Sequence, residues 1–270
     1  MQSAILGGLS YLSKAEFSVR ELDKHVGVLH RTGDSILSFG VDVLNEVLAS
    51  VVPDNSDVLE IGCGKKSFFR DIRDKSINWY GLDVYDVDYR GQRSIATHIG
   101  SVHDMPFDSQ SIDFVLANQS LEHWFEYGVS IEDGLTEIAR VLRSNGEAWL
   151  NFPLFLHADP RCLRGNLCNI LEEIPSDLFH EIKVEFLVSK KTNNYKGWRS
   201  CGFPDFMVPS RTSLNINLIL KRNKVQAISK SIKKPAKKIS LFSRLSSYGM
   251  RFLLWKIIMR PLGLDRKIVS

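Results

Sequence analysis

The sequence predicts an α/β protein with a doubly wound, Rossmann-like and mainly parallel sheet. Between residues 57 and 152, short apolar runs that suit strands alternate with segments that carry apolar residues at helical spacing. Such alternation is typical of parallel strands whose connecting helices cover both faces of the sheet. The chain has 270 residues and 44% apolar content, which suffices for one sizeable core with appendages.

The N-terminal segment, residues 1–52, is expected to be helical. Apolar residues recur at helical spacing after the candidate N-cap Asp34: Leu37, Val41, Leu44 and Leu48. The turn-forming residues at 53–55 then break the pattern. We therefore place the start of the main domain at residue 53.

The main domain is predicted to span residues 53–223. Apolar runs predict strands at about 57–61, 78–82, 95–99, 112–117 and 147–152. A helix is expected to start near Lys65, after the first of these strands. The domain closes with two strand-like runs, 182–188 and 214–220, that are expected to pair as an antiparallel edge of the sheet.

One predicted helix, at about 131–143, has signals at both ends. Its apolar face consists of residues at helical spacing, Ile131, Leu135, Ile138 and Leu142. Ser130 and Asp133 resemble a capping box at the start, and Asn145-Gly146 supplies a left-handed stop.

The charge of the chain is divided between an acidic body and a basic tail. Residues 221–270 contain 14 Lys and Arg against one acid, Asp265, whereas residues 1–220 contain 21 basic and 30 acidic residues. Residues 224–270 are predicted to form a basic linker and a C-terminal helix. That helix suits peripheral contact with an anionic membrane, and equally docking on the body or on a partner. Nucleic acid is disfavoured as a partner because the body is acidic, and no oligomeric state is predicted.

Several classes of protein are excluded by missing patterns. The N-terminus lacks the pattern of a secretory signal, and no apolar run reaches the roughly 18 residues of a spanning helix, so a cytoplasmic protein is predicted. The cysteines have no paired CxxC spacing: Cys63, Cys162, Cys168 and Cys201. Neither a disulfide framework nor a metal site is expected.

The end of the first main-domain strand indicates a ligand site. Glu60 precedes two closely spaced glycines, Gly62 and Gly64, which allow the backbone to approach a ligand. Asp83 follows the second strand, nineteen residues after Gly64, near the spacing at which such folds present a carboxylate to ribose hydroxyls. A nicotinamide-binding fingerprint would need a third glycine where Ser67 stands. A phosphate-binding GxxxxGK[ST] loop that used Gly64 would need a glycine where Leu59 stands, so the sequence does not match that motif either. An adenosyl cofactor is therefore favoured.

Four segments in this order resemble a known family: Val58–Gly64, Gly81–Asp83, Asp104–Phe107, and Asp113–Leu116 with Leu121–His123. Over about residues 50–155 the chain resembles a class I S-adenosylmethionine-dependent methyltransferase of the type 11-like kind. The resemblance implies a doubly wound fold and S-adenosylmethionine as the cofactor.

The resemblance also implies a set of cofactor contacts: Glu60, Gly62, Cys63, Gly64, Asp83, Val84, Asp104, Met105, Asn118 and Gln119. Within this set, Asp83 is expected to bind the ribose hydroxyls and Asp104 the adenine amino group. Asn118 and Gln119 are expected beside the methionine amine and the sulfonium.

The next residues supply candidate catalytic groups. His123 is a candidate general base because imidazole titrates near neutrality and the residue follows the fourth strand. Glu122 has a similar position. The alternative for both residues is that they only serve the start of a helix.

The predicted activity is methyl transfer to a small-molecule or lipid-linked acceptor, with residues 153–210 building the acceptor side. Similar stand-alone domains act on sugars of cell-surface glycans, so the resemblance points first to polysaccharide biosynthesis. The competing hypothesis is a noncatalytic scaffold that keeps the cofactor fold. Methyl transfer requires little from the protein, because the methyl group of the sulfonium is already activated. The protein mainly has to align this group with the acceptor and exclude water.

Overall fold

The computed structural model describes residues 15–22, 48–65, 67, 69–70, 76–86, 93–154, 158–189, 198–200, 207–209 and 214–224. Its strands are β1 (Ala15–Leu22), β2 (Asp57–Ile61), β3 (Asn78–Asp83), β4 (His98–Ile99), β5 (Ile112–Asn118), β6 (Leu142–Leu154), β7 (Phe179–Ser189), β8 (Trp198–Ser200), β9 (Met207–Pro209) and β10 (Leu214–Arg222). Its labelled helices are the 3₁₀-helix η2 (Leu121–Tyr127), and α3 (Ile131–Val141), α4 (Pro160–Arg164) and α5 (Leu167–Leu171). Of the predicted tail, residues 224–270, all but Lys224 lie outside the described residues.

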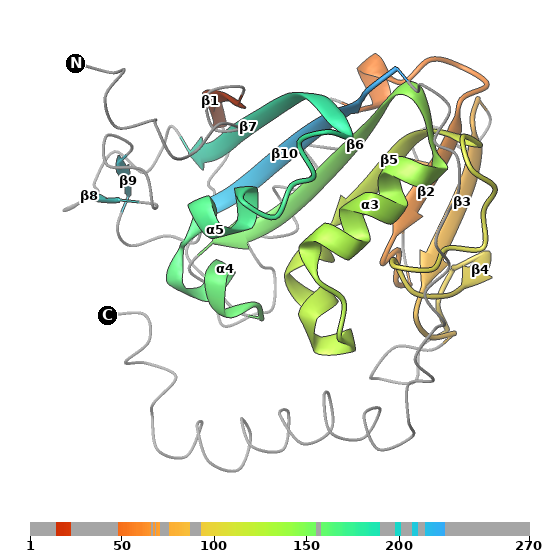
Figure 1. The fold of residues 1–270 in the computed structure, drawn as a ribbon, viewed down its shortest axis with the longest axis horizontal. Helices are drawn as coiled ribbons and strands as arrows, with labels where there is room; N and C mark the ends of the chain where they lie inside the picture. The colour runs from red at the N-terminus through yellow and green to blue at the C-terminus, as the bar shows by residue number, and fades with distance from the viewer. Residues whose placement is uncertain are drawn as a thin grey trace, which may run out of the picture.

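Eight strands form one mixed sheet in the order β1-β7-β10-β6-β5-β2-β3-β4 (Figure 1). The pairs from β4 through β6 are all parallel, and strand order reverses direction at β2 and β5. Strand β10 is antiparallel to both β6 and β7. The predicted Rossmann-like sheet with an antiparallel C-terminal pair is therefore confirmed. The short strands β8 and β9 pair separately.

The N-terminal prediction is wrong at residues 15–22. This segment is not helical but forms β1, which pairs in parallel with β7 along its whole length, from Ala15 opposite Ile182 to Leu22 opposite Ser189. The antiparallel pair β7-β10 is consequently not the edge of the sheet, because β1 lies outside it. Leu48 begins a short helical stretch in the described residues, whereas Asp34 and the rest of the predicted stripe lie outside them.

Helix α3 begins as predicted and ends earlier. The Ser130 hydroxyl accepts a hydrogen bond from the Asp133 amide at 3.0 Å and caps the helix. The helix ends at Val141, and the next strand starts at once. Asn145 has the predicted left-handed conformation, with φ 63°, but it lies inside β6. Ile112 pairs with Leu142 and Phe114 pairs with Glu147, so five residues of β6 lie opposite two residues of β5. Asn145 and Gly146 therefore form an irregularity in the pairing and do not stop the helix.

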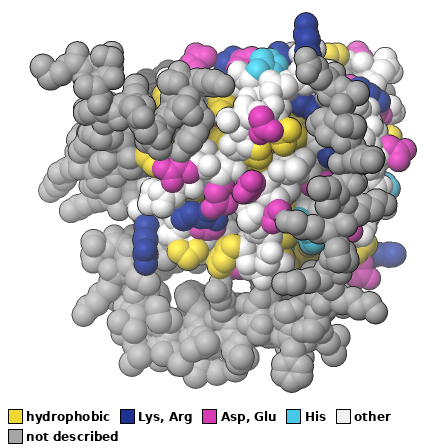
Figure 2. Space-filling model, in the orientation of Figure 1, with side chains coloured by type: hydrophobic (Ala, Val, Ile, Leu, Met, Phe, Trp, Pro, Cys, Tyr) yellow, Lys and Arg dark blue, Asp and Glu magenta, His cyan; other side chains and the backbone are white. Residues whose placement is uncertain are grey.

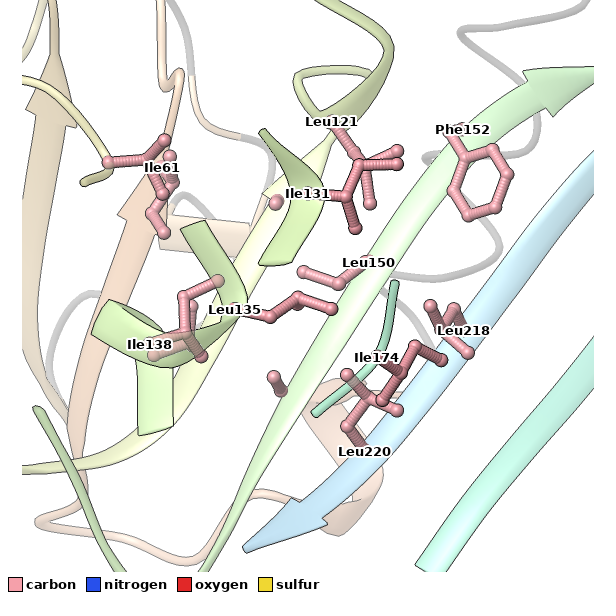
Figure 3. Close-up of a cluster of buried hydrophobic side chains, with 14 of the residues drawn as sticks. Ile61, Leu121, Ile131, Leu135, Ile138, Leu150, Phe152, Ile174, Leu218 and Leu220 are labelled. Carbon is pink, nitrogen blue, oxygen red and sulfur yellow. The ribbon is translucent and has the colours of Figure 1, made fainter. Parts of the chain in front are cut away.

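The main core lies between the sheet and helices α3, α4 and α5, which cover one face in Figure 1. Ile131, Leu135 and Ile138 of α3 are at most 2% exposed, and Leu135 lies beside the β6 residue Leu150 (Figure 3). A smaller cluster on the opposite face includes Leu48 and Trp149. The sheet is thus packed on both faces, as a doubly wound fold requires.

The outer surface over these helices is mixed in charge. Figure 2 shows acidic and basic side chains interspersed on the face in view. Arg161 pairs with Asp159 before α4 and with Glu173 after α5. Glu173 also accepts a hydrogen bond from the Ile131 amide at 3.1 Å, so these ion pairs tie the short helices to the start of α3. No helix in the described part of the chain is long and apolar enough to cross a membrane.

Candidate active site

A cavity of about 180 Å³ opens at the carboxyl ends of β2, β3 and β5. This is where ligands bind in open α/β sheets. Five of the twelve residues predicted for the site line it: Gly62, Asp83, Val84, Gln119 and His123. The other seven do not line it: Glu60, Cys63, Gly64, Asp104, Met105, Asn118 and Glu122.

The loop after β2 brings the backbone to the cavity wall. Gly62 and Gly64 have left-handed conformations, with φ 69° and 57°, which L side chains rarely adopt. The Gly62 amide donates to the Leu82 carbonyl at 2.8 Å. A Cβ atom at Gly62 would lie 2.7 Å from the Cβ atom of Ser120, whereas one at Gly64 would meet nothing within 4 Å. Glycine is therefore needed at position 62 for both conformation and space.

Asp83 is held in place by two backbone amides. Its Oδ2 accepts from the Gly64 amide at 2.9 Å, and its Oδ1 accepts from the Val84 amide at 2.7 Å. A carboxylate oxygen has further lone pairs after one such bond. Since Asp83 lines the cavity, its remaining acceptor capacity suits the vicinal hydroxyls of a ribose.

Glu60 lies behind the cavity wall, with 4% of its surface exposed. Its Oε2 accepts from the Ser67 hydroxyl and from the Trp79 indole nitrogen. Burial raises the pKa of Glu60, and these two hydrogen bonds oppose the rise. Glu60 thus connects the end of β2 to Ser67 and to Trp79 of β3, and its predicted contact with the cofactor stays a prediction.

Cys63 contributes only its backbone to the loop. Its side chain is 4% exposed, and a Cβ atom at Gly81 would lie 2.9 Å from its sulfur. Burial raises the pKa of Cys63 to about 12. The thiol is therefore protonated at neutral pH and has little nucleophilic character.

Asn118 and Gln119 provide unsatisfied polar groups at the end of β5. Both polar side-chain atoms of Asn118 and the Nε2 of Gln119 are buried without a hydrogen-bond partner. Such groups cost about 1–3 kcal/mol each when they remain unpaired. Together they offer two donors and one acceptor beside the glycine loop. The α-amino acid part of S-adenosylmethionine carries matching groups, so the residues present fit this cofactor.

Asp104 and Met105, the two residues predicted for the adenine end of the site, do not line the cavity. Asp104 is exposed, and the Met105 amide and carbonyl are bonded to Glu137 and Arg140. Ser101 and Val102 line the cavity instead. They follow β4 directly, and the position of residues after a parallel strand is the signal that points to them. The roles predicted for Asp104 and Met105 stay predictions.

His123 lines the cavity, and its Nδ1 lies 3.3 Å from the Glu126 carboxylate. Burial lowers the pKa of His123, but the hydrogen bond to Glu126 and the charges of Glu122 and Glu126 outweigh it, so the pKa is raised. A raised pKa keeps a larger protonated fraction at neutrality. His123 would act as a base in its neutral form, which becomes more abundant as pH rises.

Glu122 is fully buried, and neither carboxylate oxygen has a hydrogen-bond partner. Burial raises its pKa to about 7, although the charge of His123 opposes the rise. The charge of Glu122 in turn adds to the burial that raises the pKa of Cys162. The side chain therefore lies in the core near Cys162, while its neighbour His123 lies at the cavity.

Comparison with known proteins identifies the class of this domain. Residues 59–150 match the family model described as a methyltransferase domain. No protein with a curated description matches the sequence. The match covers the glycine loop, Asp83, His123 and the strands that carry them.

Solved structures with similar folds include three that differ in size. Protein PH0226 from Pyrococcus horikoshii has 14% identity and a TM-score of 0.46, over 71% of this chain and 93% of that one. Phosphoethanolamine N-methyltransferase 2 from Haemonchus contortus has 12% identity and a TM-score of 0.45, over 69% and 53%. CurJ carbon methyltransferase has 13% identity and a TM-score of 0.44, over 70% of this chain and 56% of that one.

The family match and the fold define residues 59–150 as a class I S-adenosylmethionine-dependent methyltransferase domain. Its cofactor is S-adenosylmethionine. Gly62 and Asp83 at the cavity, with the unpaired amides of Asn118 and Gln119 beside it, would hold this cofactor.

We predict that Gly62→Ala is more damaging than Gly64→Ala. Both substitutions force an alanine into a left-handed conformation, at about 1–2 kcal/mol, but only the new methyl group at position 62 also collides with Ser120. Overpacking adds about 1–3 kcal/mol. Chemical denaturation should show the larger loss of unfolding free energy for Gly62→Ala, and equal losses would contradict this explanation.

A second prediction concerns Glu122. Its pKa is raised from 4.5 to about 7 in the folded state, so its contribution to stability is complete below about pH 4.5 and is lost as pH rises through 7. At pH 8 the buried carboxylate costs about 3 kcal/mol. Glu122→Gln should therefore raise the free energy of unfolding at pH 8 by about 1–3 kcal/mol and change it little near pH 4.5.

The matched control for Glu122 is Glu172→Gln, because Glu172 is exposed at the end of α5. Denaturant titrations at both pH values should show no comparable gain for this control. A gain for Glu122→Gln that is the same at both pH values would refute the assigned titration.

Proposed function

We propose that the protein transfers a methyl group from S-adenosylmethionine to a small-molecule or lipid-linked acceptor. When bound, S-adenosylmethionine supplies an electrophilic methyl group on its sulfonium. The observation that carries the proposal is that Asp83 and His123 line one cavity. Asp83 offers a carboxylate that suits the cofactor's ribose, and His123 offers a side chain that can take a proton. Alignment of the acceptor with the methyl group and removal of the acceptor proton are the two tasks left to the protein.

His123 is proposed as the general base. Its neutral imidazole would take the proton of an acceptor hydroxyl or amine, and Glu126 would stabilise the imidazolium that forms. Trp124 and Tyr127 line the same cavity and would exclude water from the acceptor. Glu122, one residue away and fully buried, is proposed to act on His123 through its charge and not by contact with the acceptor.

The acceptor proposed first is a sugar hydroxyl of a cell-surface glycan, in polysaccharide biosynthesis. This choice rests on the resemblance to stand-alone domains with that activity. A lipid-linked sugar would suit a cytoplasmic enzyme whose basic tail contacts an anionic membrane. A noncatalytic scaffold that binds the cofactor is the alternative, and the presence of His123 at the cavity favours the enzyme.

Asp83→Ala should abolish S-adenosylmethionine binding measured by calorimetry. The substitution removes the carboxylate that lies at the cavity and accepts a hydrogen bond from the Gly64 amide. His123→Asn should bind the cofactor with nearly unchanged affinity. NADH serves as the control ligand and should not bind. A well-folded wild type that fails to bind S-adenosylmethionine would overturn the cofactor site.

The same variants separate an enzyme from a scaffold. Labelled methyl transfer from S-adenosylmethionine would be screened against nucleotide sugars and lipid-linked glycans. The proposal predicts transfer by the wild type and a loss of about 100-fold or more in His123→Asn, which is the usual scale for a general base. Cofactor binding without transfer to any acceptor would favour the scaffold.

Deletion of residues 225–270 tests the membrane proposal. The deletion removes 11 of the 14 basic residues that follow residue 220, and each basic residue near an anionic surface contributes about 1 kcal/mol. The shortened chain should no longer sediment with phosphatidylserine-containing liposomes, while its calorimetric affinity for S-adenosylmethionine stays unchanged. Unchanged sedimentation would contradict the proposed role of the tail.

A further inference from the structure

Ser120, just after β5, lines the cofactor cavity with a hydroxyl group that is only half used. Its oxygen accepts a hydrogen bond from the Trp124 indole nitrogen at 3.0 Å. An indole N–H can only donate, so this bond occupies a lone pair of the oxygen and leaves the hydroxyl hydrogen free. Among the described residues, no group accepts that hydrogen. Ser120 is 9% exposed, so a largely buried residue has a donor to offer at the cavity.

The Ser120 hydroxyl lies beside the glycine loop. A Cβ atom at Gly62 would come within 3.1 Å of Ser120 Oγ, and Gly62 lines the same cavity. Because glycine has no side chain, the backbone of the loop can approach the hydroxyl this closely. The free donor therefore lies where β2 and β5 end, next to the loop that is expected to contact the cofactor.

Gln119, the preceding residue, brings a second donor to the same place. It lines the cavity, and its Nε2 has no hydrogen-bond partner in the described part of the chain. In a continuous strand, the side chains of residues 119 and 120 would point to opposite faces. Gln119 instead has a left-handed conformation, with φ 54°, and its amide donates to the Asn151 carbonyl at 2.7 Å. This turn at the end of β5 brings two consecutive residues to one cavity.

The order of the strands indicates which part of the cofactor meets these donors. Along the edge where the cavity opens, the strands follow one another as β4, β3, β2 and β5. Asp83 at the end of β3 suits the ribose, which lies between the adenine and the methionine part of S-adenosylmethionine. With the adenine toward β4, where Ser101 and Val102 line the cavity, the methionine part extends past Gly62 toward the end of β5.

We propose that the Ser120 hydroxyl, with the Gln119 side-chain amide beside it, binds the carboxylate of the cofactor's methionine part. The methionine part carries an ammonium group, which can only donate, and a carboxylate, which can only accept. Two adjacent donors therefore suit the two carboxylate oxygens. Trp124 is a positioning residue in this arrangement, because its indole fixes the direction of the Ser120 hydroxyl. The inference rests on S-adenosylmethionine as the cofactor.

The test compares S-adenosylmethionine with its decarboxylated form, which keeps the adenosine, the sulfonium and the ammonium group. Calorimetry should show that the wild type binds S-adenosylmethionine roughly ten-fold or more tightly, the scale of a hydrogen bond to a charged group. Ser120→Ala should weaken S-adenosylmethionine by roughly ten-fold or more and change the affinity for the decarboxylated ligand by about two-fold or less. Ser111→Ala is the matched control, because the Ser111 hydroxyl donates to the Asp108 carbonyl and does not line the cavity.

A double variant separates the loss of the hydroxyl donor from a disturbance of the packing. Ser120→Ala alone leaves the Trp124 indole, which is 4% exposed, without its acceptor. Adding Trp124→Phe removes that unpaired donor, so the double variant should bind S-adenosylmethionine as weakly as Ser120→Ala does. Trp124→Phe alone keeps the hydroxyl and should lower the affinity by about three-fold or less.

Several results would overturn the carboxylate subsite. Unchanged S-adenosylmethionine affinity in Ser120→Ala would show that the hydroxyl does not bind the cofactor, and a simultaneous fall in methyl transfer would assign it to the methyl acceptor. Equal weakening of both ligands would show a general effect on the site. Recovery of affinity in the double variant would assign the loss to the unpaired indole. Binding of neither ligand by the wild type would refute the cofactor assignment as well.

Discussion

The close contact between Gly62 and Ser120 is the constraint on which the site depends, because it brings together the ends of β2 and β5. It continues into the fold on both sides. The Ser120 hydroxyl accepts from the Trp124 indole at 3.0 Å, and the Trp124 ring lies where a Cβ atom at Gly134 of α3 would come within 2.6 Å of it. Two glycines thus let one serine and one tryptophan connect the cofactor loop to the main covering helix.

Two buried acids near the cavity, Glu60 and Glu122, differ in how their carboxylates are hydrogen-bonded. Glu60 satisfies its carboxylate with Ser67 and Trp79, whereas Glu122 has no such partner. Burial raises the pKa of both, to about 7 for Glu122. A hydrogen-bonded acid stiffens a loop at modest cost, while an unpaired one makes stability sensitive to pH. The glycine loop and the start of η2 therefore respond differently to a change in protonation.

Local signals predicted most of the sheet, and non-local contacts account for the failures. Strand β2 was predicted at its observed bounds, since a short apolar run before glycine specifies a buried strand without reference to distant residues. Strand β1 was missed because its partner lies more than 160 residues later. The glycines and Asp83 were found by spacing, but the orientation of the Glu122 carboxylate depends on packing against residues such as Cys162 that no motif contains.

The pairing of β1 with β7 also affects the order of folding. β7 is flanked by β1 on one side and by β10 on the other. The first described strand therefore pairs with β7, which ends at Ser189, and the next strand of the sheet, β10, ends at Arg222. Closing so long a loop is slow and contributes to a high contact order. During synthesis, residues 15–22 leave the ribosome before β7, the strand with which they pair. The parallel core around β2 and β5 can therefore assemble first, and β1 completes the sheet as a late step.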